Sequence, residues 1–284
     1  MVWLITAFLF IVTTVLILLK QQWWPWWGLT AVVISQSLIT GWKDTKYGTI
    51  ANAIILIAAV AAIAGYRFDK KVREDVTTLL KNASVARGEI ITPGHLAHLP
   101  PVVQQWLNRS GIIGRKMTRT VRLQQKGMMR TKPGSKWMPF TAEQYFTVDT
   151  PGFVWKAKVQ VQMLPLITLA GEDMLTNGQA HMQISLLSLF PVVNEYNNPK
   201  INSASLIRYL AETEWFPAAA LGPDIHWEAT GDHMATATLS YQGVTVSGTF
   251  VFDTNGDPVS FTAQRYMGAG ENAAEEIQQH QIHW

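Results

Sequence analysis

The stretch Met234–Phe252, MATATLSYQGVTVSGTFVF, decides the fold of the larger part of this 284-residue chain. Apolar and polar side chains alternate on both sides of Gln242-Gly243, which is typical of two antiparallel strands joined by a tight turn. The same alternation precedes it in Ile225–Thr230 and follows it in Val259–Arg265. The four segments therefore predict a meander of hairpins within one antiparallel sheet.

Further strand signals precede this meander, and a few helical segments accompany them. Asn177-Gly178 is the strongest two-residue hairpin signal in the chain. The predicted strands are Thr118–Gln125, Thr141–Val148, Phe153–Met163, Ile167–Leu175 and Gln179–Leu187. Helices are expected from Thr92, over Pro100–Leu107 and over Ser203–Glu214. The pattern predicts an α+β fold, in which a curved antiparallel β-sheet, half-barrel-like, carries a few packed helices on one face.

The N-terminal part of the chain has a different composition. Three runs contain no charged residue, namely Val2–Leu19, Pro25–Thr40 and Gly48–Gly65. A membrane-spanning helix needs about 20 mostly apolar residues, because backbone polar groups in lipid must be paired internally. We therefore expect three transmembrane helices in residues 1–66, an amphipathic helix and linker in residues 67–92, and the antiparallel β domain in residues 93–284.

Polar and aromatic residues refine this membrane assignment. The tryptophans of Trp23–Trp27 are typical of an interfacial anchor, and Asn52 is expected to form a hydrogen bond between helices. With three spans, five basic residues would share the side of the β domain and two would lie opposite, which favours a cytoplasmic β domain. The two groups are Lys20, Arg67, Lys70, Lys71 and Arg73, and Lys43 and Lys46.

Composition excludes several classes of function. Basic and acidic residues are almost equal in number after residue 66, so there is no electrostatic case for nucleic-acid binding. The chain has no cysteine, which rules out disulfides, thiolate nucleophiles, cysteine–zinc sites and iron–sulfur clusters. Rossmann, P-loop and G-x-S-x-G patterns are also missing from the sequence. We therefore predict no cofactor, no metal site and no catalytic residue.

The remaining titratable residues give only weak signals. His226 and Glu228 are two apart on a strand and share a face, and His181 is a possible neighbour, but solvated histidines are the commoner outcome. A carboxylate pair is conceivable among Glu143, Glu172, Asp173, Glu212 and Glu214. His280-x-x-His283 has helical ligand spacing, yet it lies in a polar C-terminal segment that we expect to be a frayed tail.

Two segments combine aromatic residues with proline at the boundaries of elements, Lys136–Phe140 and Trp215-Phe216-Pro217. Such segments plug a core or a corner of a sheet, or they form the rim of an apolar cavity, where methionine supplies adaptable packing. The candidate ligand-binding rim comprises Trp137, Met138, Phe140, Tyr145, Trp155, Trp215, Phe216 and Trp227.

Several of these segments resemble a bacterial, membrane-anchored family that is a domain of unknown function. The resemblance rests on LPPVVQQWL at Leu99–Leu107 and on WMPFTAEQYF at Trp137–Phe146, and it covers roughly residues 90–266. Weaker matches are Pro191-Val192-Val193, Arg208–Glu212, Trp215-Phe216-Pro217 and Phe250–Asp253. The resemblance brings no activity and no catalytic residues with it. It implies an integral protein of a bacterial inner membrane.

The strand layout is also similar to the half-barrel of the bacterial lipoprotein carriers, which enclose acyl chains; this is an analogy of fold alone. In family members more strand follows the position of Arg265-Tyr266, whereas Gly268–Trp284 here is short and polar. We therefore do not expect a closed barrel.

Three functional hypotheses follow. The first is a membrane-tethered, non-enzymatic domain that binds a lipid or another apolar ligand, with the bilayer as its other partner. The second is a structural or interaction module of a membrane or envelope complex. The third, a hydrolase, requires Glu143 to converge with His226 and Glu228 in one cleft.

Overall fold

The structure, a computed structural model, describes residues 1–41, 47–81, 83, 88–130, 134–161, 167–266 and the backbone of 275–281. Its contacts divide the chain into two units. The helical unit comprises Met1–Arg73 with Ser185–Pro191, and the β unit comprises Glu74–Ile184 with Val192–Trp284.

Three helices form the N-terminal part: α1 (Val2–Leu18), α2 (Trp24–Thr40) and α3 (Tyr47–Lys81). The buried Asn52 on α3 donates hydrogen bonds to Ser35 Oγ at 3.1 Å and Gln36 Oε1 at 3.0 Å, both on α2. This confirms the predicted hydrogen bond between helices. Because an unpaired amide would be costly in such apolar surroundings, these contacts hold α2 and α3 in register.

The number of membrane spans differs from the prediction. Among the described helices, α3 alone is long and apolar enough to cross a membrane, with 35 residues. Helices α1 and α2 have 17 residues each, about 25 Å at 1.5 Å per residue, which is short of the roughly 30 Å hydrocarbon core. The prediction of three spanning helices is therefore corrected to one helix that could span a membrane. The segment predicted as an amphipathic helix is helical and continues α3 past Gly65.

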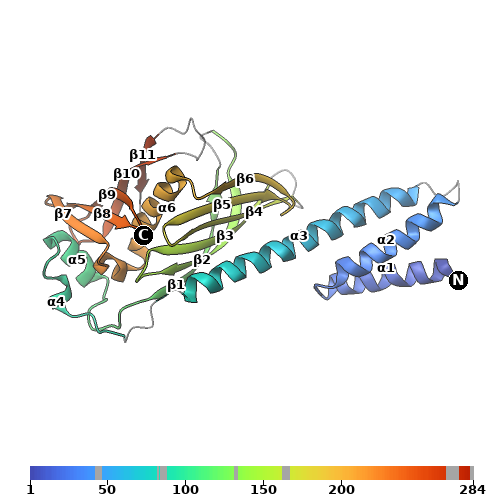
Figure 1. Ribbon diagram of the computed structural model, residues 1–284, viewed down its shortest axis with the longest axis horizontal. Helices are drawn as coiled ribbons and strands as arrows, with labels where there is room; N and C mark the ends of the chain where they lie inside the picture. The colour runs from blue at the N-terminus through green and yellow to red at the C-terminus, as the bar shows by residue number, and fades with distance from the viewer. Residues whose placement is uncertain are drawn as a thin grey trace. The chain divides into compact units, whose positions relative to one another are not determined.

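The β unit contains two open antiparallel sheets, which corrects the prediction of one sheet (Figure 1). The first sheet follows the chain in order through six strands. They are β1 (Thr120–Met129), β2 (Met138–Thr147), β3 (Gly152–Gln160), β4 (Thr168–Thr176), β5 (Gln179–Leu186) and β6 (Phe190–Tyr196). The second sheet has the order β11-β10-β9-β8-β7. These strands are β7 (Ile225–Gly231), β8 (Met234–Tyr241), β9 (Val244–Phe252), β10 (Pro258–Tyr266) and β11 (Glu275–Gln281).

The helix α6 (Pro199–Glu212) separates the two sheets along the chain. Asn198 caps it by accepting a hydrogen bond from the Lys200 amide at 2.9 Å, and Pro199 occupies the first turn, where its missing N–H costs nothing. Two 3₁₀ turns, η2 (Thr213–Trp215) and η3 (Pro217–Leu221), lead on to β7. Because a helix and two turns replace the hairpin after β6, the next strands start a new sheet. Helix α6 contacts β4 of the first sheet and β8, β9 and β10 of the second.

An aromatic core joins the second sheet to the short helices α4 (Pro93–Leu96) and α5 (Pro101–Arg109). Trp227 on β7 lies 6.1 Å from Trp106 on α5 and 5.3 Å from Phe250 on β9, between ring centroids. A Cβ added at Gly248 would overlap the buried ring of Phe261. Glycine at this position therefore leaves room for the Phe261 ring against β9.

Two strands lie outside the predictions. The polar C-terminal segment, expected to be a frayed tail, contains β11, which pairs with β10 from Ser260↔Gln281 to Tyr266↔Glu275. Strand β6 was not predicted, because its burial pattern is largely exposed and Pro191 interrupts the strand signal. His280 lies in β11, while His283 lies outside the described residues.

Candidate functional site

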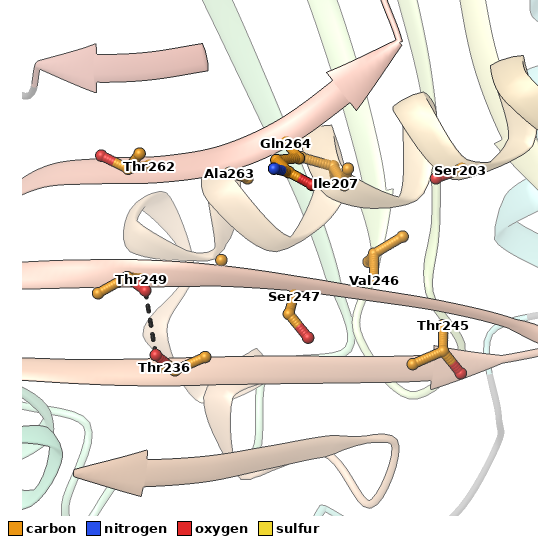
Figure 2. Close-up of a pocket in the computed structure, with 11 residues that line it drawn as sticks. Ser203, Ile207, Thr236, Thr245, Val246, Ser247, Thr249, Thr262, Ala263 and Gln264 are labelled. Atoms are coloured by element: carbon orange, nitrogen blue, oxygen red, sulfur yellow. Dashed lines mark hydrogen bonds between the residues drawn. The ribbon is translucent and has the colours of Figure 1, made fainter. Parts of the chain in front are cut away.

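A groove opens in the second sheet where β9 and β10 diverge. Their register runs from Pro258↔Phe252 to Thr262↔Thr249 and stops there, although both strands continue. Beyond Thr262 the described partner of β10 is β11. Figure 2 shows β10 bending away from β9 at this point, with α6 behind the gap.

The groove has a volume of about 400 Å³ and an amphiphilic lining. The apolar part comes from Ile207 of α6, Val246 of β9 and Ala263 of β10. The rest of the lining is the backbone of Gly248 and a set of side chains that carry hydroxyl or amide groups. These side chains are Ser203, Thr236, Thr245, Ser247, Thr249, Thr262 and Gln264. None of these lining residues is charged. The groove is therefore suited to a neutral ligand with both apolar and hydrogen-bonding parts.

The hydroxyl groups beside the groove are ordered by hydrogen bonds between β8 and β9. Thr236 Oγ1 lies 3.0 Å from Thr249 Oγ1, and Ser240 Oγ lies 2.9 Å from Thr245 Oγ1. Each pair uses one of its two hydroxyl hydrogens, so the other hydrogen and further lone pairs stay free to face a ligand or water.

The backbone of β9 also faces the groove. The two-residue turn Gln242-Gly243 makes Tyr241 and Val244 the first hydrogen-bonded pair of the β8–β9 hairpin. By alternation, the N–H and C=O groups of Thr245 and Ser247 point away from β8, toward the side where β10 has diverged. On that side the structure describes no strand paired with these two residues.

A second feature of the β unit is a largely buried ion network centred on Arg208 of α6. Its Nη1 lies 2.7 Å from Asp173 Oδ2 on β4, and its Nε lies 2.8 Å from Glu212 Oε1. The guanidinium also lies over the rings of Phe153 and Trp155, at 4.9 Å and 5.0 Å from their centroids. These contacts fix α6 against the first sheet.

Neutral side chains extend this network across the first sheet. Gln144 donates to Glu212 Oε2 at 2.7 Å and accepts from Gln125 Nε2 at 3.3 Å. Gln125 in turn accepts the indole N–H of Trp155 at 2.8 Å. Most of the buried polar atoms are thereby paired, which is the condition for a polar network to be compatible with a packed interior.

The pKa shifts in this network arise from burial and from the charges of neighbouring side chains. Burial acts to lower the pKa of Arg208, but the charges of Glu212 and Asp173 outweigh it and raise that pKa. Burial, and then repulsion by Arg208, lowers the pKa of the neighbouring Arg265. Burial, and then repulsion by Glu212, raises the pKa of Glu214 to about 7. Glu214 therefore exchanges a proton near neutral pH.

The candidate rim residues do not line the groove, and the structure distributes them over several sites. Phe216 and Trp227 are buried in the core, with Phe216 4.4 Å from Phe146 and Trp227 donating to the Ala220 carbonyl at 3.1 Å. Trp215, in η2, is 38% exposed. Tyr145 donates to Glu143 Oε2 on the first sheet.

Four candidates do lie near one another, on β2, on β3 or directly before β2. Phe140 and Trp155 are half-buried, with ring centroids 6.4 Å apart. Met138 is also half-buried and pairs in register with Met129. Trp137 precedes it and is covered on one face by Arg130, whose Cζ lies 5.0 Å from the ring centroid.

The acid–base candidates do not share a described site. His226 and Glu228 form an exposed pair on β7, with Nε2 and Oε1 3.4 Å apart. Glu143 lies on β2 of the other sheet and binds Arg122. His181 lies 3.2 Å from Asn194 Oδ1. Within the described parts of the chain, no three His, Cys, Asp or Glu side chains form a group able to hold a metal ion.

Sequence reasoning missed both the groove and the centre of the ion network. The network carried one usable signal: Arg208 and Glu212 are four residues apart on a predicted helix, which is ion-pair spacing. The groove carried none, because no local feature of the sequence marks Thr262 as the point where β10 leaves β9.

Comparison with the curated proteins and with the solved structures gives no match. A family model matches residues 89–280, which is more than half of the chain. This match confirms the resemblance found over the Leu99–Leu107 and Trp137–Phe146 motifs and extends it into β11. The chain belongs to DUF6544, a family of unknown function.

Proposed function

We propose that this protein is a membrane-tethered, non-enzymatic binding domain whose ligand is a lipid or another apolar molecule with an uncharged polar group. The single observation that carries the proposal is the groove between β9 and β10, with its apolar floor and its uncharged hydroxyl rim. In this assignment Ile207, Val246 and Ala263 contact the apolar part of the ligand. The hydroxyls of Thr245 and Ser247 bind its polar group.

The size and chemistry of the groove support this class of ligand. Its volume of about 400 Å³ is within the range typical of small-molecule sites, roughly 300–1,000 Å³. An ionic head group would leave water without meeting a compensating charge there, and that costs several kcal/mol. Neutral lipids and neutral amphiphiles carry no such cost, so the groove discriminates in their favour.

The helices support the tether. Helix α3 has the length and apolarity of a membrane span, and Trp23, Trp26 and Trp27 are exposed, as expected of side chains in a membrane interface. In the proposal α1 and α2 lie in the same bilayer as α3. Four basic residues follow the apolar part of α3. By the positive-inside rule they favour a β unit on the cytoplasmic side of a bacterial inner membrane. They are Arg67, Lys70, Lys71 and Arg73.

The analogy to the lipoprotein carriers, which enclose acyl chains, supports no specific ligand. Native mass spectrometry of the full-length protein, released from detergent, tests the proposal. We expect one neutral lipid or amphiphile per chain to survive removal of the detergent. A chain that emerges without any bound molecule, from a preparation shown to be folded, contradicts the proposal.

A second candidate function is an interaction module that accepts an extended peptide strand. The observation that favours it is the pair of backbone groups at Thr245 and Ser247, which face the groove where β10 has diverged. Exposed strand edges of this kind bind peptides by adding a strand. The same mass measurement separates the two candidates, because a retained peptide has a mass and fragmentation pattern that no lipid shares.

A further inference from the structure

The end of the β1–β2 hairpin is basic and apolar at the same time. The described residues 126–130 and 134–140 include Lys126, Arg130 and Lys136 but no acidic residue. Between these basic residues lie Met128 and Trp137, each 50% exposed. Exposed tryptophan is uncommon on a soluble protein surface that has no partner.

The strand register places four of these side chains on one face. Lys126, Met128 and Arg130 are two residues apart along one strand, so they project on the same side. The register Met128↔Pro139 brings Trp137 opposite Arg130, and the guanidinium of Arg130 lies over the indole ring at 5.0 Å. We call Lys126, Met128, Arg130 and Trp137 the hairpin patch.

The hairpin patch is on the face of the first sheet that points away from the ion network. Gln125 is bound to Trp155 and Gln144 within the network. Lys126 and Met128 are one and three residues further along the strand, so they project to the opposite side. The hairpin patch therefore does not pack against the buried ion network. Packing of the fold does not explain why this patch is both basic and apolar.

We propose that the hairpin patch docks on the surface of an anionic lipid bilayer. The indole of Trp137 lies at the level of the head groups, where aromatic side chains are favoured, and Met128 fills the adjacent apolar space. Lys126 and Arg130 bind lipid phosphates. Charge complementarity selects this partner, because the hairpin end carries three basic residues, Lys126, Arg130 and Lys136, with no acidic residue among its described positions 126–130 and 134–140, and basic residues are attracted to an anionic leaflet.

This inference rests on the membrane tether of the proposed function and not on the groove. A chain whose α3 crosses a bilayer keeps its β unit close to that bilayer, so a weak contact is formed at high effective concentration. Docking at the hairpin also orients the β unit on the membrane, which a single flexible attachment does not do.

The absence of native cysteine makes the test simple. Met128→Cys in the full-length chain gives one thiol, to which an environment-sensitive nitrobenzoxadiazole fluorophore is attached. The protein is placed in nanodiscs of phosphatidylcholine alone or of phosphatidylcholine with phosphatidylglycerol, each with and without nitroxide-labelled lipid. Ala229→Cys, at an exposed position on β7, is the matched control.

We expect the lipid nitroxide to quench the fluorophore at position 128 strongly in anionic discs, weakly in zwitterionic discs, and not to quench it at position 229. Lys126→Gln with Arg130→Gln should then lower the ratio of docked to undocked chains about fivefold for each charge removed, the effect of one basic residue near an anionic leaflet. Retention of near-ultraviolet circular dichroism shows that these exposed substitutions leave the fold intact.

Two results overturn the inference: no quenching at position 128 in anionic discs, or quenching that is equal in both lipids and unchanged by the charge substitutions. Failure of the chain to enter the nanodiscs at all contradicts the membrane tether instead. Loss of the groove ligand changes neither the quenching at position 128 nor the entry of the chain into nanodiscs. The outcomes therefore show separately whether the hairpin docking, the membrane tether or the groove ligand is wrong.

Discussion

Arg208 Nη1 on α6 lies 2.7 Å from Asp173 Oδ2 on β4, an ion pair between residues 35 positions apart in the sequence. The pair joins the helix that packs on the second sheet to a strand of the first. Both side chains are largely buried, at 18% and 3% exposed. A buried charge whose partner is removed is far more costly than an intact pair.

Arg208→Met is therefore expected to destabilise the β unit by about 3–5 kcal/mol, because it leaves Asp173 and Glu212 buried without the guanidinium that binds both of them. Arg208→Lys should cost less, since it keeps the charge but loses the planar stacking on Phe153 and Trp155. Urea unfolding of the full-length protein in detergent, followed by near-ultraviolet circular dichroism, measures both losses. The control is Arg109→Gln, which removes an exposed ion pair with Asp257 and should change stability little.

Glu214 predicts a pH dependence of stability. Burial and the charge of Glu212 raise its folded-state pKa from 4.5 to about 7, so the folded protein holds this proton more tightly than the unfolded chain does. The stabilisation is complete below pH 4.5 and is lost as the pH rises through 7. It is on the order of 2 kcal/mol, at 1.4 kcal/mol per pKa unit and with allowance for solvent screening.

Glu214→Gln is expected to remove this dependence. Between about pH 4.5 and 8 the unfolding free energy of the wild type should fall with rising pH more steeply than that of the variant, so the difference between the two curves should change by about 2 kcal/mol. Parallel curves over the whole range would show that Glu214 titrates as an ordinary exposed carboxyl.

Gly248→Ala tests the packing of the Phe261 ring against Gly248 of β9. The added Cβ overlaps the ring of Phe261, which is buried and hence confined. Overpacking of this kind typically costs about 1–3 kcal/mol. Ser247→Ala, one residue away on the exposed face, is the control and should cost less than about 1 kcal/mol, in line with surface substitutions. Equal losses in the two variants would contradict the described packing.

The β meander shows what local sequence can predict. Four strands from Ile225 to Arg265 were predicted from alternation and turn residues, and all four are present as β7 to β10. Strand alternation and Gln242-Gly243 are local properties, so a single sequence suffices to find them. The N-terminal helices were likewise visible as apolar runs, but their exact length, and hence the number of spans, was not.

The arrangement of the sheets could not be predicted from the sequence, because it depends on contacts between residues that are distant along the chain. The chain gives no local sign that β6 ends one sheet and β7 begins another. Pairing of β11 with β10 is encoded in a polar segment whose composition is typical of a tail. The groove lies where the pairing of β9 with β10 stops, at Thr249 and Thr262, and no local signal marks that point. The Arg208–Asp173 ion pair is similarly invisible, since only the folded chain brings α6 onto β4.

The assignment of the ligand to the groove is tested most directly by a pair of matched substitutions. Ser203 lines the groove from α6, whereas Thr230 is an exposed residue on β7 outside the lining. Ser203→Phe fills the groove, and Thr230→Phe adds similar bulk elsewhere. Native mass spectrometry of the full-length variants should show the bound lipid or amphiphile retained by the wild type and Thr230→Phe and lost from Ser203→Phe. Equal retention by both folded variants would contradict a ligand in the groove between β9 and β10.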